Sequence, residues 1–439
     1  MPDIKLDLKK YANAVHAAKP VRLHGKVTQV VGLVIEGYCP DTSVGAICEI
    51  RPQEGETIPA EVVGFRNNKT LLMPLGEVRG VGLDSLITVR RDNATLGVGP
   101  ALLGRVIDGL GQPIDDKGGI ASEEEYPIYA LPVNPMTRPP IRKPLDLGIR
   151  SINGLLTCGQ GQRVGIMAGS GVGKSTLLGM IARYTEADVN VIALIGERGR
   201  ELREFIEKDL QEEGLKKSVV VVATSDQPPL VRVRGAYIAT AIAEYFKNQG
   251  KKVLLMMDSA TRFAMALREV GLAIGEPPTT KGYTPSVFAA LPKLLERTGN
   301  FPEGSITALY TVLVEGDDFN EPISDAMRSI LDGHIVLSRE LAARAIYPPI
   351  DVLASASRVM TDVATREHLD LAARFKESMA TYRQSEDLIN IGAYKAGSNS
   401  GIDYAVAHID QMRAFLKQAV HDPVVLNDAV QDLRDMFAD

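Results

Sequence analysis

The residues with the clearest chemical meaning lie in the glycine-rich segment AGSGVGKSTLL, residues 168–178. An apolar run, RVGIMA, leads into this segment, and an apolar helical pattern follows it. Glycines allow the backbone to curl so that its N–H groups converge on a phosphate, with the N-terminus of a helix behind them. In such a loop Lys174 reaches the β- and γ-phosphates of a nucleotide, and the Ser175 hydroxyl coordinates Mg²⁺. The segment therefore predicts a nucleotide site.

The strict phosphate-loop pattern has glycine where this chain has Ala168, with Gly169 next to it. This departure is small because the order of strand, loop and helix is intact. The nucleotide-binding residues predicted from this segment are Ala168, Gly169, Ser170, Gly171, Val172, Gly173, Lys174, Ser175 and Thr176.

Two carboxylates end other apolar runs. Asp258 closes KVLLMMD, where we expect it to hold Mg²⁺ through a water; the alternative is that it caps the next helix. Glu197 follows IALIG, and taken alone it would be a solvated loop carboxylate. Because the carboxyl ends of parallel strands converge on one crevice, a carboxylate there can instead act as a general base, and the residues alone leave both interpretations open.

A hydrolytic site also needs positive charge for the γ-phosphoryl group. Arg358, in PPIDVLASASR, lies about 180 residues after the glycine-rich loop. One interpretation is an arginine finger supplied by a neighbouring subunit, which is worth roughly 10³–10⁵ in rate. The other is a salt-bridged surface arginine, and the residues alone do not decide between them.

The alternation of strands and helices that positions these residues predicts a doubly wound α/β domain over residues 91–360. Residues 20–90 contain short Val- and Ile-rich runs broken by Gly, Pro and Asn-Asn, which favour a small antiparallel barrel or sandwich. Residues 361–439 show helical patterns without strand signals.

The first 19 residues form a separate segment. Ile4, Leu8, Tyr11 and Val15 fall at helical spacing, which predicts a short amphipathic helix. The alternative is an arm that is frayed or packed on its own domain.

Composition excludes several classes of protein. The 439 residues carry a net charge of −6, which gives no general attraction to nucleic acid or anionic lipid. Three cysteines, without a C-x-x-C pair, indicate reduced thiols in a cytoplasm. The apolar runs are far shorter than the roughly 20 residues that span a bilayer, and the N-terminus has no apolar signal core. We expect a soluble, intracellular protein.

Several longer segments carry a family resemblance. Over nearly the whole chain, the sequence resembles the catalytic subunits of the rotary-ATPase superfamily. The segments that carry this resemblance are GERGREL, GEPPTTKGYTPSVFAALPKLLERTG, EGDDFNEPISDAMRSILDGHIVLSR, YPPIDVLASASR and LLGRVIDGLGQPID. Within that superfamily the chain resembles a type III secretion ATPase. The segments GLLTCGQGQRVGIMAGSGVGKSTLLGMIAR and LINIGAYKAGSNSGID are more similar to the flagellar export branch than to the injectisome branch.

The resemblance implies an α/β fold in which a RecA-like P-loop NTPase core is flanked by an N-terminal β-barrel and a C-terminal helical domain. It implies a homohexamer with nucleotide sites between neighbours. In these sites Glu197 is the catalytic glutamate, Lys174 and Arg198 lie beside the phosphates, and Arg358 is the finger of the next subunit. Tyr347 stacks on adenine, although the residues alone indicate a packing tyrosine before a Pro-Pro turn.

The implied function is that of an ATP-hydrolysing motor with ATP and Mg²⁺ as ligands, which releases and unfolds chaperone-bound cargo at a flagellar export gate. The implied partners are a stator-like regulatory dimer at the N-terminal arm, a stalk-like coiled-coil protein, an export gate membrane protein and chaperone–cargo complexes. The implied location is the cytoplasm, with peripheral docking at the inner face of the cytoplasmic membrane.

Several alternatives share the fold. An injectisome ATPase and a catalytic subunit of an F- or V-type rotary ATPase share the chemistry as well. A Rho-type hexameric helicase would need aromatic platforms in a basic groove, but residues 20–90 hold only Tyr38 and Phe65 as aromatics, so no nucleic acid partner is expected. A regulatory module without turnover is disfavoured by Glu197.

Overall fold

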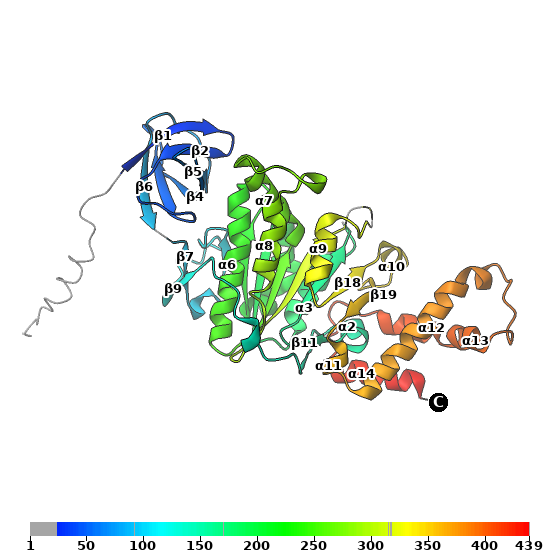
Figure 1. The fold of residues 1–439 in the computed structure, drawn as a ribbon. Helices are drawn as coiled ribbons and strands as arrows, with labels where there is room; N and C mark the ends of the chain where they lie inside the picture. Colours follow the sequence, from blue (N-terminus) through cyan, green and yellow to red (C-terminus); the bar gives the residue numbers. More distant parts are fainter. Residues whose placement is uncertain (1–23, 92, 170, 315, 317, 439) are drawn as a thin grey trace, which may run out of the picture. The chain divides into compact units, whose positions relative to one another are not determined.

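The computed structural model describes residues 24–91, 93–169, 171–314, 316 and 318–438 (Figure 1). The chain forms two compact units, Met1–Ala94 and Thr95–Asp439. The amphipathic arm predicted over residues 1–19 and the predicted loop residue Ser170 lie outside the described residues.

The first unit contains a closed antiparallel barrel with the strand order β1-β2-β5-β4-β3-β6. Its strands are β1 (His24–Val31), β2 (Val34–Tyr38), β3 (Ile47–Arg51), β4 (Ile58–Arg66), β5 (Lys69–Pro74) and β6 (Leu86–Arg91). Asn67 and Asn68, both with positive φ, turn β4 into β5, as a tight hairpin between twisted strands requires. Inward side chains such as Ile35, Ile50 and Leu72 fill the interior. Of the two predicted forms, the barrel is the one observed.

The second unit is built on a mixed sheet with the strand order β19-β18-β12-β17-β15-β13-β14-β8. Its strands are β8 (Val106–Asp108), β12 (Arg163–Ala168), β13 (Val189–Ile195), β14 (Ser218–Ala223), β15 (Lys252–Asp258), β17 (Ser305–Leu313), β18 (Gly333–Leu337) and β19 (Ile350–Ser357). Neighbours along this order pair in parallel, except that β19 is antiparallel to β18. Short β16 (Gly299–Asn300) pairs antiparallel with β17.

The strand order places a crevice at the carboxyl end of β12. The chain leaves β12 for β13, which lies three places away, and returns later through β17 to the position beside β12. At such a switch point the connections on either side diverge and leave room for a ligand. The carboxyl ends of β12, β13 and β15 therefore face the same region, where the sequence predicts the nucleotide site.

Helices cover the sheet on its faces. The long helices of this part are α3 (Lys174–Tyr184), α6 (Pro229–Asn248), α7 (Ala260–Ala273), α8 (Pro285–Leu295) and α9 (Pro322–Ile330). Figure 1 shows α6, α7 and α8 side by side over the sheet, and α6 packs on β13, β14 and β15. Helix α6 is buried along most of its length, which explains its high content of Ala, Val and Ile.

The C-terminal part of the second unit is helical, as predicted. Its helices are α12 (Arg366–Asn390), α13 (Ser400–Leu416) and α14 (Leu426–Phe437). Thr365 caps α12, and Asn399 caps α13 after the Gly-Ser-Asn loop. The sequence patterns did not separate α14, which packs on α2 (Arg150–Leu155). Among the described residues, no helix is both long and apolar enough to cross a membrane.

The remaining elements are short connections. They are β7 (Thr95–Val98), η1 (Pro100–Leu102), β9 (Glu124–Pro127), η2 (Pro135–Thr137), β10 (Pro144–Leu145), β11 (Cys158–Gly159), α4 (Gly199–Glu204), the π-helical turn η3 (Phe205–Leu210), α5 (Gln211–Lys216), η4 (Thr280–Gly282), α10 (Arg339–Ala343) and α11 (Met360–Val363).

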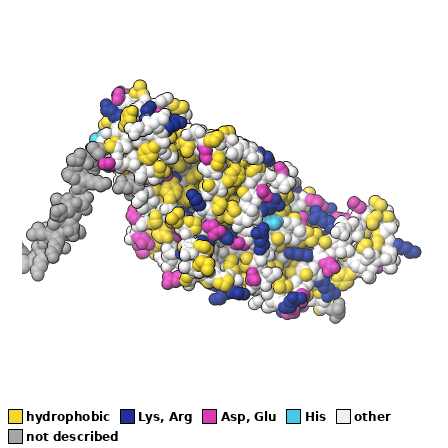
Figure 2. Space-filling view, viewed as in Figure 1, with side chains coloured by type: hydrophobic (Ala, Val, Ile, Leu, Met, Phe, Trp, Pro, Cys, Tyr) yellow, Lys and Arg dark blue, Asp and Glu magenta, His cyan; other side chains and the backbone are white. Residues whose placement is uncertain are grey.

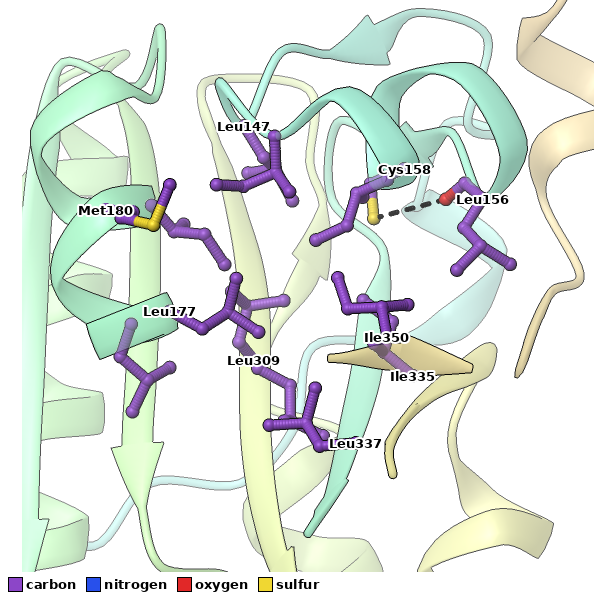
Figure 3. Close-up of a cluster of buried hydrophobic side chains, with 14 of the residues drawn as sticks. Leu147, Leu156, Cys158, Leu177, Met180, Leu309, Ile335, Leu337 and Ile350 are labelled. Carbon is purple, nitrogen blue, oxygen red and sulfur yellow. Dashed lines mark hydrogen bonds between the residues drawn. The ribbon is translucent and has the colours of Figure 1, made fainter. Parts of the chain in front are cut away.

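One continuous apolar core fixes β12 and α3, and it extends from the sheet into the C-terminal helices. In Figure 3, Leu177 of α3 lies beside Leu309 of β17, and Cys158 lies beside Leu156 in the same cluster. The Cys158 thiol is buried, and burial raises its pKa to about 12. Close packing on both sides leaves the loop between β12 and α3 little freedom to shift.

Candidate active site

The glycine-rich loop joins β12 to α3, as predicted. Ala168 is still part of β12, where it pairs with Leu313 and Leu337, so its extended backbone has no need of glycine. Gly173 has φ 84° and begins α3. A Cβ atom on Gly169 would lie 2.7 Å from Nη2 of Arg339, so a larger residue there would displace that guanidinium from the loop.

Lys174, Asp258 and Glu197 meet at the end of the loop. The Lys174 Nζ lies 2.5 Å from Asp258 Oδ1 and 3.7 Å from Glu197 Oε1. The three side chains come from the start of α3, the end of β15 and the residue after Gly196, beyond β13. The lysine and the two carboxylates predicted from separate motifs therefore form one cluster.

The cluster is largely buried, and this shifts its protonation equilibria. Burial opposes the charge of Lys174, but the nearby carboxylates of Asp258 and Glu197 outweigh it and raise the lysine pKa. Burial also raises the pKa of Glu197, and the negative charge of Asp258 raises it further. Glu197 is therefore a stronger base than an exposed glutamate, which suits a group that accepts a proton.

Asp258 does not cap the following helix. Ser259 does so, because its hydroxyl accepts a hydrogen bond from the Arg262 backbone N–H at 3.2 Å. The side chain of Asp258 faces Lys174 and accepts a second hydrogen bond from the Thr311 hydroxyl at 2.7 Å. The capping alternative is therefore wrong for this residue.

The cluster lies on one side of a polar cleft. Its lining residues are Ala168, Gly169, Gly171, Gly173, Lys174, Ser175, Thr176, Gly196, Glu197, Arg198, Glu201, Ser225, Arg262, Leu313, Val314, Gly316 and Arg339. Most of the predicted nucleotide-binding residues are among them. Val172, which belongs to the loop itself, is buried. Arg198 is exposed and donates to Glu201 Oε1 at 2.9 Å, so it is held at the rim of the cleft.

Tyr347 lies beside the glycine-rich loop. A Cβ atom on Gly173 would be 3.8 Å from the Tyr347 ring, and the tyrosine is 49% exposed. Its carbonyl accepts a hydrogen bond from the Gln418 N–H at 2.9 Å, which ties this segment to the end of α13. An open aromatic face next to the loop is the geometry that stacking on a base needs.

Arg358 is placed elsewhere. It follows β19, its guanidinium donates to the Arg328 carbonyl at 3.2 Å, and its side chain is exposed. It is not among the lining residues of the cleft. The described part of the chain thus brings Lys174, Glu197 and Asp258 together but leaves Arg358 outside their site.

Sequence reasoning missed two arginines of the cleft. Arg262 packs over Gly196, and its buried Nε has no hydrogen-bond partner in the described part of the chain. Arg339 begins α10 and lies against Gly169. Both arginines follow the carboxyl end of a strand, where site residues are expected. Arg262 lies in the first turn of the helix after β15, and Arg339 follows the end of β18.

Helix α10 also contacts the C-terminal helices. Arg344, the residue after α10, pairs with Glu340 of that helix at 2.9 Å and with Glu386 of α12 at 3.0 Å. Glu386 also accepts from Arg413 of α13 at 3.4 Å. The short helix that presents Arg339 to the loop is therefore bonded on its other side to α12, and through Glu386 to α13.

Comparisons with known proteins agree with this arrangement. The model of the ATP synthase alpha/beta family nucleotide-binding domain matches residues 148–357. The model of the T3SS EscN ATPase C-terminal domain matches residues 364–435. Together the two matches cover the cleft, every strand of the main sheet except β8, and most of the C-terminal helices.

Individual relatives match over most of the chain. The flagellum-specific ATP synthase of Bacillus subtilis is 56% identical and covers 94% of this chain and 95% of its own. The type 3 secretion system ATPase of Xanthomonas euvesicatoria is 52% identical over 90% of each chain.

Solved structures match as well. The assembled ATPase EscN of enteropathogenic E. coli has a TM-score of 0.88 at 47% identity, covering 94% of this chain and 99% of that chain. A second structure, of EscN in complex with its central stalk EscO, matches equally well.

The Lys174 cluster leads to a prediction for the nucleotide-free protein. Lys174→Met leaves two neighbouring carboxylates without their cation and should lower the free energy of unfolding by about 2 kcal/mol. This loss is smaller than the penalty for breaking a fully buried ion pair, because the cleft admits water. The thermal unfolding midpoint measures this. Adding Asp258→Asn should restore most of the loss, since the remaining carboxylate then has no like-charged neighbour. A single variant as stable as the wild type would contradict the electrostatic description.

Proposed function

The chain belongs to the family of ATPases that serve flagellar and type III protein export, and we propose that its hydrolytic sites are shared between six identical copies in a ring. One observation carries the proposal. Lys174 and Glu197 line one cleft and Asp258 contacts Lys174, whereas the exposed Arg358 neither lines this cleft nor pairs with any of the three. A neighbouring copy is the simplest source of the missing arginine.

Each group has a separate task in the proposed reaction. Glu197 orients the attacking water and accepts its proton, which its raised pKa favours. Lys174 moves from Asp258 to the phosphates, and Arg358 of the next copy stabilises charge on the γ-phosphoryl group. The Tyr347 ring stacks on adenine beside the loop. Arg198, Arg262 and Arg339 add positive charge around the phosphates.

Magnesium fits the donors present. Ser175 and Asp258 both offer oxygen atoms, the ligands that this ion prefers, and one Asp258 oxygen is not engaged by Lys174. When bound, Mg²⁺ would neutralise charge on the phosphate oxygens. We propose Ser175 as its direct ligand and Asp258 as a ligand through water.

The work proposed for hydrolysis is the release and unfolding of chaperone-bound cargo. Helix α10 supports such coupling, because Arg339 touches the phosphate loop while Arg344 is bonded to Glu386 of α12. A change at the phosphates thus has a direct mechanical path to the C-terminal helices. We propose that these helices move in turn around the ring as successive sites close.

The tip of the α12–α13 hairpin supports a stalk-like partner. Leu388, Ile391 and Val406 are exposed there, and Figure 2 shows yellow side chains gathered at this end of the molecule. The EscN relative was solved in complex with a central stalk protein. A regulatory dimer at residues 1–19, an export gate protein and chaperone–cargo complexes complete the proposed partners, with the ring docked at the inner face of the cytoplasmic membrane.

A complementation experiment tests the shared site. Glu197→Gln should bind nucleotide without turnover, and Arg358→Ala should hydrolyse ATP at least 10³-fold more slowly than the wild type, the lower end for an arginine finger. In an equal mixture, some interfaces combine an intact Glu197 with an intact Arg358. Random assembly makes about a quarter of interfaces complete, so ATPase activity should reappear on mixing.

Activity that stays absent on mixing would place Arg358 in the same copy as its Glu197. Full activity of Arg358→Ala alone would show that it is not the finger. Turnover that persists in Glu197→Gln would remove the general-base assignment.

We propose the flagellar branch over the injectisome branch. The support is the resemblance of residues 154–183 and 388–403, together with the flagellar relative that is 56% identical. Deleting the gene should abolish flagellar filaments and swimming, with recovery by the wild-type chain but not by Glu197→Gln. Intact filaments with a loss of effector secretion would assign the chain to an injectisome.

A further inference from the structure

Thr311 lies directly beneath the carboxylate of Asp258. It belongs to β17, the strand between β12 and β15, and it is completely buried. Its Oγ1 donates to Asp258 Oδ1 at 2.7 Å, and the alternative acceptor, the Met257 carbonyl, is farther away at 3.3 Å. The single hydroxyl proton is therefore directed at the carboxylate.

A hydroxyl at this position needs an explanation. The strand reads SITALYTVL, and valine would fill the same volume without the cost of burying a polar group. The other buried threonine of the central part of β17, Thr307, has a structural partner, because it accepts from the Gly161 N–H at 2.8 Å. The corresponding partner of Thr311 is Asp258.

The same Asp258 oxygen has two donors. Lys174 Nζ approaches Oδ1 at 2.5 Å from the side of the cleft, and the Thr311 hydroxyl approaches it from inside the sheet. Nucleotide binding draws Lys174 toward the phosphates. Among the side chains described, Thr311 is then the donor that remains on this oxygen.

We propose that Thr311 is a positioning residue that holds the Asp258 carboxylate while Lys174 leaves it for the phosphates. Thr311 keeps Oδ1 hydrogen-bonded, fixes the rotamer of Asp258 and directs the other oxygen toward the cleft. The proposal rests on the proposed roles of Lys174 and Asp258 in the nucleotide-bound site.

A purely structural role predicts something different. Such a role would appear as a loss of stability without nucleotide, whether or not Asp258 is charged. In the proposed role the nucleotide-free protein is little affected, because Lys174 still pairs with Asp258. The cost appears when nucleotide is bound, since a buried carboxylate oxygen then loses its remaining donor.

The measurement is the dissociation constant of a fluorescent ATP analogue, with saturating Mg²⁺ and again with EDTA. Thr311→Val should weaken binding about tenfold in both conditions, the size expected for one hydrogen bond to a charged group. Thr311→Ser keeps the hydroxyl and should bind within about threefold of the wild type. Thr311→Ala, which adds no new packing contact, should show the same loss as Thr311→Val.

Thr240→Val is the matched control. Thr240 is equally buried, but its hydroxyl donates to the Ala236 carbonyl within α6, away from the cleft. This variant should bind the analogue like the wild type. Thermal unfolding without nucleotide should be similar for Thr240→Val and Thr311→Val.

A double-mutant cycle isolates the interaction. With Asp258→Asn in place the carboxylate charge is absent, and Thr311→Val should add less than about a threefold loss. Wild-type affinity of Thr311→Val, failure of Thr311→Ser to restore binding, or an undiminished loss in the Asp258→Asn background would each overturn the proposal. Unchanged Mg²⁺-dependent hydrolysis by Asp258→Asn would instead remove the proposed magnesium role of Asp258, which the binding cycle does not measure.

Discussion

The burial of one lysine between two carboxylates is the interaction on which the site depends. Lys174 lies 2.5 Å from Asp258 and 3.7 Å from Glu197, and all three side chains are largely buried. Without nucleotide, the positive charge of the lysine offsets part of the repulsion between the two carboxylates. A bound triphosphate competes for the same cation. Its arrival therefore changes the electrostatic balance of the whole cluster, and not only the position of one side chain.

The fold positions these three charged residues and connects their site with the C-terminal helices. The strand order brings the ends of β12, β13 and β15 to one crevice, and a continuous core fixes α3 against them. Helix α10 lies between the loop and the C-terminal helices, with Arg339 on one side and Arg344 on the other. Because Arg339 and Arg344 lie at the two ends of this short segment, one element contacts both the phosphate loop and α12.

The fold class could be predicted from the sequence, and so could the proximity of Lys174, Glu197 and Asp258. Each of these three residues follows or ends an apolar run that is recognisable as a strand. It did not predict Thr311, since threonine in an apolar strand is an ordinary strand former until its acceptor is known. Arg262 and Arg339 were missed for a similar reason, because their contacts with Gly196 and Gly169 exist only after the elements pack. The exposure of Tyr347 also depends on how the elements pack, so the sequence around it indicated only a packing tyrosine before a Pro-Pro turn.

The central claim is that one chain holds an incomplete site that a second copy completes. Its most direct test is the specific ATPase activity of the purified chain, measured with Mg²⁺ over a wide range of protein concentration and without partners. The account predicts a specific activity that rises steeply with concentration and then saturates as rings form. A specific activity that is low and independent of concentration would contradict it, and would mean that a different protein completes the site.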